Sequence, residues 1–196
     1  ADVEHVVFGH VINTEPKDMY LSRVASLSAG IPDNAVAMNV NRLCGSGLQA
    51  IISAAQAIKL GDAKVAIGGG AESMSRSPYV SPSQRWGARM GDAKIVDMMT
   101  GALSDPLSGV HMGVTAENVA KRHEISRADQ DALALSSHQR AENAIDQGYF
   151  RSQIVPVVQK TRKGEVVFDT DEHVRKGATA ANFDSLRPVF VKEEGT

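Results

Sequence analysis

The sequence predicts a layered α/β fold, in which parallel strands alternate with helices. Short runs rich in β-branched residues, at 6–12, 35–40 and 64–67, have the composition of buried strands. Two segments with helical apolar spacing, 19–29 and 46–60, separate these runs. Strand-helix-strand alternation of this kind is typical of a sheet covered by helices.

The first predicted helix, 19–29, places Leu21, Val24 and Leu27 at helical spacing and ends before Gly30 and Pro32. The second, 46–60, is apolar nearly all round, with Lys59 as its one charged residue, so we expect it to be buried. Its broad apolar face comprises Leu48, Ile51, Ile52, Ala55 and Ile58.

Three successive glycines, 68–70, follow the third predicted strand. They would allow a strand and a helix to approach closely, because glycine carries no β-carbon. A plain tight turn is the alternative.

Beyond residue 73 the composition changes. Residues 75–82 are rich in Ser and Pro and predict a loop. Helices are predicted over 111–124 and 126–147, the second starting with a capping box between Ser126 and Asp129. Its charges are spread, which indicates a solvated helix. Two short strands, 154–158 and 166–168, then form a hairpin.

Composition excludes several classes of protein. The chain has 196 residues, a net charge of −2 and a single cysteine, so it has no internal disulfide and no nucleic-acid footprint. The histidines lack the spacing of metal ligands. No apolar run reaches membrane-spanning length, and a cytoplasmic protein that binds no membrane is expected.

The single cysteine, Cys44, lies between a predicted strand and a predicted helix and is followed by Gly45 and Gly47. The first amides of a helix lack internal partners and, with the helix dipole, favour an anion. The position therefore favours a thiolate nucleophile. An inert, buried cysteine is the alternative.

Four motifs, in order along the chain, resemble those of the thiolases. They are NRLCGSGLQA at 41–50, GGGAESMS at 68–75, HMGVTAEN at 111–118 and LRPVF at 186–190. The resemblance is strongest to bacterial β-ketothiolases that use short acyl-CoA. It implies a thiolase-like layered fold, with part of the N-terminal core and its nucleophile in 1–73 and an inserted α+β loop domain in 74–196.

The resemblance also implies an activity. Cys44 would accept an acyl group from acyl-CoA as a thioester, which deprotonated acetyl-CoA then attacks; the reverse reaction cleaves a 3-ketoacyl-CoA with CoA. Coenzyme A serves as substrate and product, and no metal or other cofactor is expected. The parent enzymes are dimers or tetramers, in which the nucleophile-bearing helix is buried between two sheets and the loop domain contributes to assembly. Trp86 and Arg89 are candidate interface anchors.

Seven further residues match positions that contact the substrate in thiolases. Three are expected near the acyl group and pantetheine arm, and four near the nucleotide end of CoA. They are Leu103, His111 and Met112, then Arg175, Asn182, Val189 and Phe190, of which Asn182 stands where many thiolases have serine.

The resemblance further implies an internal fragment. The chain contains no Gly-His-Pro motif, no second cysteine and no Asn-Glu-Ala-Phe segment, which thiolases use for catalysis. We expect the 196 residues alone to be essentially inactive. Two other functions stay open: a cysteine-dependent thioester hydrolase, which would need a His and an Asp near Cys44, and a CoA-binding module without turnover.

Overall fold

A computed structural model describes residues 2–196, which fall into two compact units, residues 2–111 and 112–196. Each unit is described separately. The predicted boundary near residue 73 separates a core segment from a loop domain by function, whereas the division at residue 111 separates compact units. The predicted boundary stays a prediction.

A three-stranded sheet forms the centre of the first unit. Its strands are β1 (His5–Gly9), β2 (Val36–Val40) and β3 (Ala66–Gly70), in the order β2-β1-β3. Both neighbours run parallel to β1, with His5 opposite Val36 on one side and Ala66 on the other. The predicted α/β class is confirmed.

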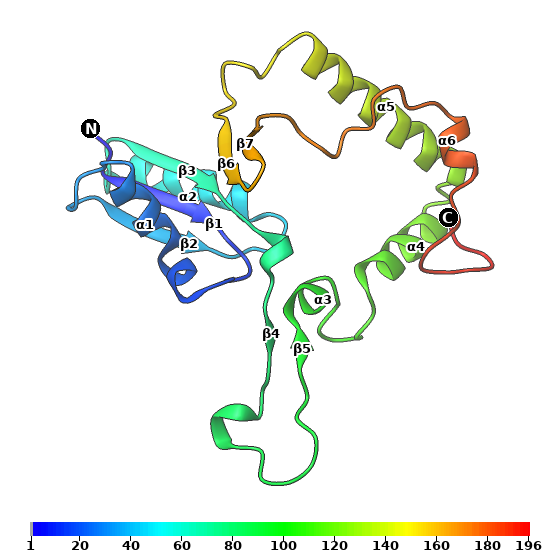
Figure 1. Ribbon diagram of the computed structural model, residues 1–196, viewed down its shortest axis with the longest axis horizontal. Coiled ribbons are helices and arrows are strands. Elements are labelled where there is room, and N and C mark those ends of the chain that lie inside the picture. The colour runs from blue at the N-terminus through cyan, green and yellow to red at the C-terminus, as the bar shows by residue number, and fades with distance from the viewer. Residues whose placement is uncertain (1) are drawn as a thin grey trace. The chain divides into compact units, whose positions relative to one another are not determined.

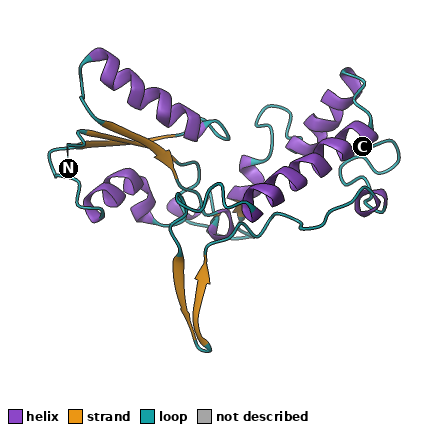
Figure 2. Ribbon diagram, turned by 90° about the horizontal axis from the view of Figure 1, so that it is seen from above, coloured by secondary structure: helices purple, strands orange, loops and turns teal. Residues whose placement is uncertain are grey.

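The two long helices of this unit cover opposite faces of the sheet (Figures 1 and 2). Helix α1 (Leu21–Ser28), preceded by the 3₁₀ helix η1 (Pro16–Tyr20), connects β1 to β2. Helix α2 (Ser46–Leu60) connects β2 to β3 and passes β1 on the way. Right-handed crossovers in opposite directions along a sheet place their helices on opposite faces.

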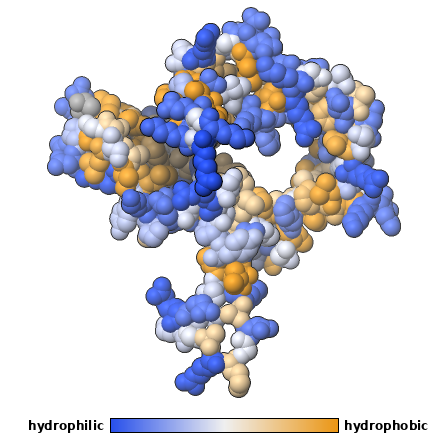
Figure 3. Space-filling view, in the orientation of Figure 1, coloured by the Kyte–Doolittle hydropathy of each residue, from blue (hydrophilic) through white to orange (hydrophobic). Residues whose placement is uncertain are grey.

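Helix α2 has the predicted bounds, but within the described residues its large apolar side chains are not buried. The expected burial of this helix between two sheets of a longer thiolase stays a prediction. The side chains that α2 buries are small: Ser46, Ala50, Ala54 and Ala57. Leu48 is 66% exposed and Ile51 55% exposed. Other large apolar side chains of this unit also stay at its surface, where hydrophobic patches are visible in Figure 3.

The glycines of β3 explain why small residues face the sheet. A β-carbon on Gly68 would lie 2.7 Å from the Cα of Ile51 and 3.1 Å from the carbonyl oxygen of Ala50. The backbones of α2 and β3 are therefore in direct contact, and only small side chains fit between them. The predicted close approach is confirmed, and the alternative of a tight turn is wrong because all three glycines belong to β3.

The buried core of the sheet is correspondingly small. Val6 and Val7 of β1 are fully buried, and Val7 packs with Ala50 and Ala54. Val40 and Ala66, from the two neighbouring strands, extend this cluster.

The rest of the first unit forms a long arm and a short helix. The arm contains η2 (Met74–Arg76), β4 (Tyr79–Val80), η3 (Gln84–Trp86) and β5 (Val96–Asp97), and β4 pairs antiparallel with β5. The predicted loop at 75–82 therefore includes a short strand. Helix α3 (Met98–Ala102) follows directly.

Asp97 caps α3, because its carboxylate accepts the backbone N–H of Met99 at 2.9 Å. The hydroxyl of Thr100, 3.0 Å away, lowers the pKa of Asp97 and keeps this cap ionised.

The second unit is built around two helices, α4 (Met112–Arg122) and α5 (Arg127–Asp146). The hairpin of β6 (Val157–Thr161) and β7 (Gly164–Phe168) and the short helix α6 (Ala181–Asp184) follow. The capping box is confirmed: Ser126 Oγ accepts the Asp129 N–H at 3.1 Å, and Asp129 accepts the Ser126 N–H at 3.1 Å. The Ser126 hydroxyl also lowers the pKa of Asp129.

Arg127, the first residue of α5, holds the C-terminal segment of this unit. Its guanidinium pairs with Asp131 at 2.8 Å and donates to the carbonyl oxygens of Phe183 and Leu186 at 2.8 and 3.1 Å. Glu117 of α4 accepts the backbone N–H of Thr196 at 2.9 Å. Residues 183–196 are thereby tied to α4 and α5.

Candidate functional site

A pocket of about 510 Å³ opens in the first unit at the carboxyl ends of the three strands. Such crevices are where open α/β sheets usually bind ligands. The residues that follow each strand, together with one side of α3, line it. They are Gly9, Val11, Ile12, Leu43, Cys44, Ser46, Gly47, Gly70, Ala71, Glu72, Met74, Met99, Ala102 and Leu103.

Cys44 lies on the wall formed by β2 and α2, and it is exposed. Gly45 is the N-cap of α2 and accepts the first helical hydrogen bond, from the N–H of Gln49 at 2.9 Å. Cys44 therefore immediately precedes the cap, at the positive end of the helix. An exposed thiol in a pocket contradicts the alternative of a buried, inert cysteine.

The turn that carries Cys44 has an unusual backbone. Leu43 has a φ of +47°, in the left-handed region that residues with a β-carbon rarely adopt. The side chain of Asn41 accepts the Leu43 N–H at 3.0 Å, and the hydroxyl of Ser46 donates to the Leu43 carbonyl oxygen at 2.5 Å. Both peptide groups of Leu43 are thus held by side chains.

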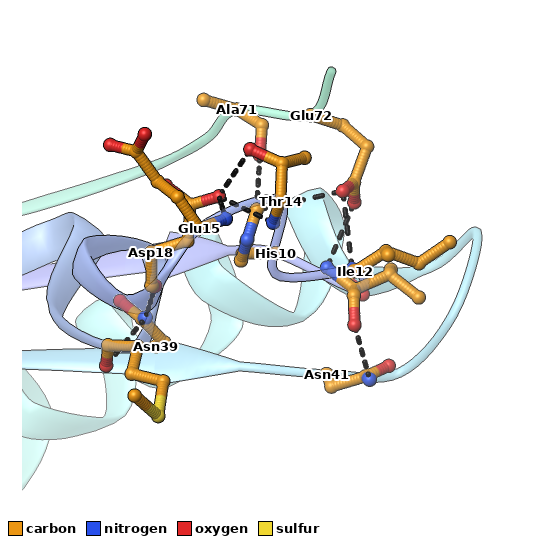
Figure 4. A network of polar contacts seen from close by, with 12 residues as sticks. His10, Ile12, Thr14, Glu15, Asp18, Asn39, Asn41, Ala71 and Glu72 are labelled. Carbon is orange, nitrogen blue, oxygen red and sulfur yellow. Dashed lines mark hydrogen bonds and ion pairs between the residues drawn. The ribbon is translucent and has the colours of Figure 1, made fainter. Parts of the chain in front are cut away.

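Glu72 forms the opposite wall and is the one charged side chain among the lining residues. Its carboxylate accepts the backbone N–H groups of Val11 and Ile12 at 2.8 and 3.2 Å (Figure 4). These two bonds join the segment after β3 to the segment after β1. Glu72 therefore shapes the wall that faces Cys44.

His10 supports the same wall from inside the protein. Its buried ring places Nδ1 2.8 Å from the Ala71 carbonyl oxygen and 3.6 Å from the Glu72 carboxylate. Among the described residues its Nε2 has no hydrogen-bond partner. His10 itself does not line the pocket.

A polar network behind this wall fixes the segment after β1 (Figure 4). Both the hydroxyl and the N–H of Thr14 donate to Asp18 Oδ2, at 2.7 and 2.6 Å. These bonds lower the pKa of Asp18. Asn39 of β2 donates to the Asp18 carbonyl oxygen at 3.0 Å, so the network connects this segment to β2.

Of the seven predicted substrate contacts, two lie in the first unit. Leu103, at the end of α3, lines the pocket together with Cys44. His111 forms an isolated antiparallel bridge with Ser104, the residue after Leu103, but does not itself line the pocket. Their contacts with a substrate stay predictions.

Phe190 lies at the start of α4 in the second unit, against the residue that follows Met112. Met112 begins α4, and a β-carbon on the next residue, Gly113, would lie 2.2 Å from the ring of Phe190. The ring therefore packs directly on the first turn of α4. Val189 is 75% exposed.

Arg175 and Asn182 belong to the segment that runs beside α5. The N–H of Arg175 donates to His138 Nδ1 at 3.3 Å, and the side chain of Arg175 is exposed. Asn182 Oδ1 accepts the Thr179 N–H at 2.8 Å, which engages this oxygen in a local turn. Contacts of either residue with CoA stay predictions.

The sequence did not point to Val11, Ile12, Glu72, Met74 or Met99 as residues of the Cys44 pocket. A signal existed for the first three, because residues that follow parallel strands meet at one edge of a sheet. The two methionines carry no comparable signal, since they reach the pocket from the arm and α3.

Two classes of site are not seen in residues 2–196. No three or more His, Cys, Asp or Glu side chains gather as they would around a metal ion. None of the described helices is both long and apolar enough to span a bilayer.

Known proteins similar to this chain are thiolases. The family model for the thiolase N-terminal domain matches residues 1–196. The chain is 69% identical over 195 residues to the β-ketothiolase BktB of Cupriavidus necator, covering 100% of this chain and 50% of that protein. It is 45% identical to an acetyl-CoA acetyltransferase of Pseudomonas aeruginosa, covering 98% of this chain and 49% of that protein. The chain thus spans about half the length of these curated relatives.

Solved structures agree with the sequence relatives. The acetyl-CoA acetyltransferase of Bacillus anthracis matches with a TM-score of 0.90 and 44% identity, over 97% of this chain and 48% of that one. Human mitochondrial 3-ketoacyl-CoA thiolase matches with a TM-score of 0.92 and 40% identity, over 97% and 49%. A second structure of the human enzyme, in complex with CoA, matches with a TM-score of 0.89 and 38% identity, over 97% and 48%.

Proposed function

The chain belongs to the thiolase family through its N-terminal domain, and from that membership we propose that Cys44 is the nucleophile of a CoA-dependent acyltransferase. The reaction is thiolysis of a short 3-ketoacyl-CoA, or the reverse condensation of two acyl-CoA molecules. The single observation that carries this proposal is the exposed thiol of Cys44 in a pocket at the start of α2.

The proposed chemistry begins with the Cys44 thiolate attacking the carbonyl carbon of an acyl-CoA. A bond forms between this sulfur and the acyl carbon, and CoA leaves as its thiolate. In condensation, a base takes the α-proton of acetyl-CoA, a role that the resemblance assigns to a second cysteine in thiolases. The resulting carbanion attacks the enzyme-bound thioester, forming a carbon–carbon bond and releasing the Cys44 thiolate. Water-poor, mostly apolar surroundings suit this carbanion step, and most side chains that line the pocket are apolar.

Coenzyme A is the proposed substrate and product bound by this chain. The matched human thiolase was solved in complex with CoA, which supports CoA binding by this chain. An exposed guanidinium at Arg175 suits the phosphates or the adenine ring. The nucleotide end of CoA is proposed to contact Val189, Phe190 and Asn182 as well. The acyl group and the pantetheine arm are proposed to contact Leu103, His111 and Met112.

A homo-oligomer in the cytoplasm completes the proposal. Trp86 is 86% exposed and Met90 97% exposed on the arm of the first unit. Exposed aromatic and methionine side chains are common at protein interfaces. We expect this arm to contact a second copy of the protein.

Membership of the thiolase family supports acyl transfer over hydrolysis. A cysteine hydrolase needs a histidine beside the thiol. Among the described residues the pocket lining includes no histidine, and the one nearby, His10, is buried against Ala71. Because the resemblance implies that thiolases also use a histidine, the products of the reaction distinguish acyl transfer from hydrolysis.

The test is thiolysis of acetoacetyl-CoA by the full-length protein that contains this chain. We expect two acetyl-CoA for each acetoacetyl-CoA and CoA consumed, and we expect Cys44→Ala to abolish turnover. Release of free acid instead would support the hydrolase. CoA binding without turnover by the intact protein would support the binding module.

A further inference from the structure

We propose that Ser46, assisted by Asn41, is a positioning residue that holds the Cys44 thiol in its reactive orientation. The inference rests on the proposed function of Cys44 and adds to it the device that orients the nucleophile. Ser46 is not itself a nucleophile here, because its hydroxyl is already engaged.

The hydroxyl of Ser46 spans the turn that carries Cys44. It accepts the Arg42 N–H at 2.9 Å and donates to the Leu43 carbonyl oxygen at 2.5 Å. The backbone N–H of Ser46 donates to the same carbonyl oxygen at 3.0 Å. Ser46 therefore bonds to both residues that precede Cys44.

Burial makes these bonds hard to replace. Ser46 is 5% exposed, so water has little access to its hydroxyl. On the other side, the Asn41 side chain accepts the Leu43 N–H and donates to the Val11 carbonyl oxygen at 3.4 Å. Asn41 thus joins the turn to the opposite, β1 side of the pocket.

Leu43, which has a positive φ of 47°, lies between the hydrogen bonds made by Ser46 and those made by Asn41. Strained backbone persists only where its surroundings over-determine it. Without the buried Ser46 hydroxyl, the backbone of Arg42 and Leu43 loses two hydrogen bonds, and Leu43 can relax toward a negative φ. Because Leu43 and Cys44 share a peptide bond, that relaxation rotates the thiol away from its position in the pocket.

The test compares Ser46→Ala with wild type in the full-length protein. A displacement on the order of 1 Å can lower a rate about 100-fold, so we expect kcat for thiolysis to fall about 10- to 100-fold with KM within about twofold. We expect slower alkylation of Cys44 by iodoacetamide, with a changed pH profile. The Arg42 amide should also exchange its hydrogen faster.

Ser26→Ala is the matched control. Ser26 is 4% exposed and its hydroxyl donates to the Arg23 carbonyl oxygen, but it lies in α1, away from the turn. It should leave kcat and alkylation unchanged. If Ser46→Ala does not fold, Asn41→Ala replaces it, since Asn41 is exposed and its loss should slow alkylation without unfolding the protein.

Wild-type kcat and a wild-type alkylation profile in the folded variant would overturn the inference. Alkylation needs no acyl-CoA. If wild type lacks thiolase activity but Ser46→Ala still slows alkylation, the proposed reaction fails while the positioning role stands.

Discussion

Gly9 and the first turn of α2 are in direct backbone contact: a β-carbon on Gly9 would lie 2.6 Å from the carbonyl carbon of Ser46. Helix α2, which follows Cys44, therefore starts against the last residue of the central strand. This contact fixes the distance between β1 and the Cys44 turn. It makes Gly9 a sensitive position for both stability and activity.

Gly9→Ala should destabilise the protein by about 1–3 kcal/mol, the usual cost of forcing extra atoms into a packed site. It should also lower kcat, because the start of α2 must move. Chemical unfolding and steady-state kinetics measure the two effects. Gly47→Ala is the control for stability, since a β-carbon there meets no atom within 4 Å; equal losses in the two variants would contradict the contact.

Gly68 and Gly69 form a second matched pair. Gly68→Ala would place a β-carbon 2.7 Å from the Cα of Ile51, whereas the nearest neighbour at Gly69 is the Phe8 ring at 3.4 Å. We expect Gly68→Ala to cost about 1–3 kcal/mol of unfolding free energy and Gly69→Ala clearly less. The midpoint of urea unfolding distinguishes them, and the reverse order would show that α2 does not rest on β3 as described.

Glu72→Ala should loosen the wall that faces Cys44. The change leaves two backbone N–H groups without their carboxylate acceptor, and hydrogen bonds to charged groups contribute about 1.5–3 kcal/mol. We expect a loss of about 2 kcal/mol in unfolding free energy. Glu72→Gln keeps one acceptor oxygen and should retain part of it.

Lys176→Ala provides the comparison for Glu72. It removes an ion pair with Asp146 whose side chains are 59% and 55% exposed. Such exposed pairs contribute less than about 1 kcal/mol. A Glu72→Ala loss no larger than the Lys176→Ala loss would refute the role assigned to Glu72.

Thr14→Val should raise the pKa of Asp18 toward its ordinary value, because it removes the hydroxyl that lowers it most. A carboxyl whose pKa is lowered in the folded state stabilises the fold at every pH above its unfolded pKa of about 3.9. This contribution is lost as the pH falls through the folded pKa. The variant should therefore be less stable than wild type at neutral pH, and the difference should vanish well below pH 4. Thr14→Ser, which keeps the hydroxyl, should behave as wild type; a difference that persists in acid would point to packing instead.

The sequence motifs and the apolar periodicity together predicted much of the fold. The strand at 35–40, the helix at 46–60 and the turn that joins them lie where apolar periodicity and Gly45 indicated, so Cys44 was located correctly. The capping box at Ser126 was equally local, since it needs only residues three apart. These features depend on short-range chemistry that the sequence displays directly.

Other features depend on contacts between distant segments. Periodicity marked Leu48 and Ile51 as the buried face of α2, but the glycines of β1 and β3 bring the backbones together and leave room only for Ala50 and Ala54. The Glu72 carboxylate accepts hydrogen bonds from Val11 and Ile12, which are 61 and 60 positions away in the sequence. No local pattern could predict these bonds. The same holds for Met99, which lines the pocket together with Cys44 although the two residues are far apart in the sequence.

The measurement that tests the central claim most directly is the mass of the Cys44 peptide after the full-length protein is mixed with acetyl-CoA and quenched in acid. We predict one acetyl group on Cys44, released on addition of free CoA with regeneration of acetyl-CoA, and none on the Cys44→Ala variant. An unmodified Cys44 peptide, from protein whose thiol still reacts with iodoacetamide, would contradict the assignment of Cys44 as the acyl carrier.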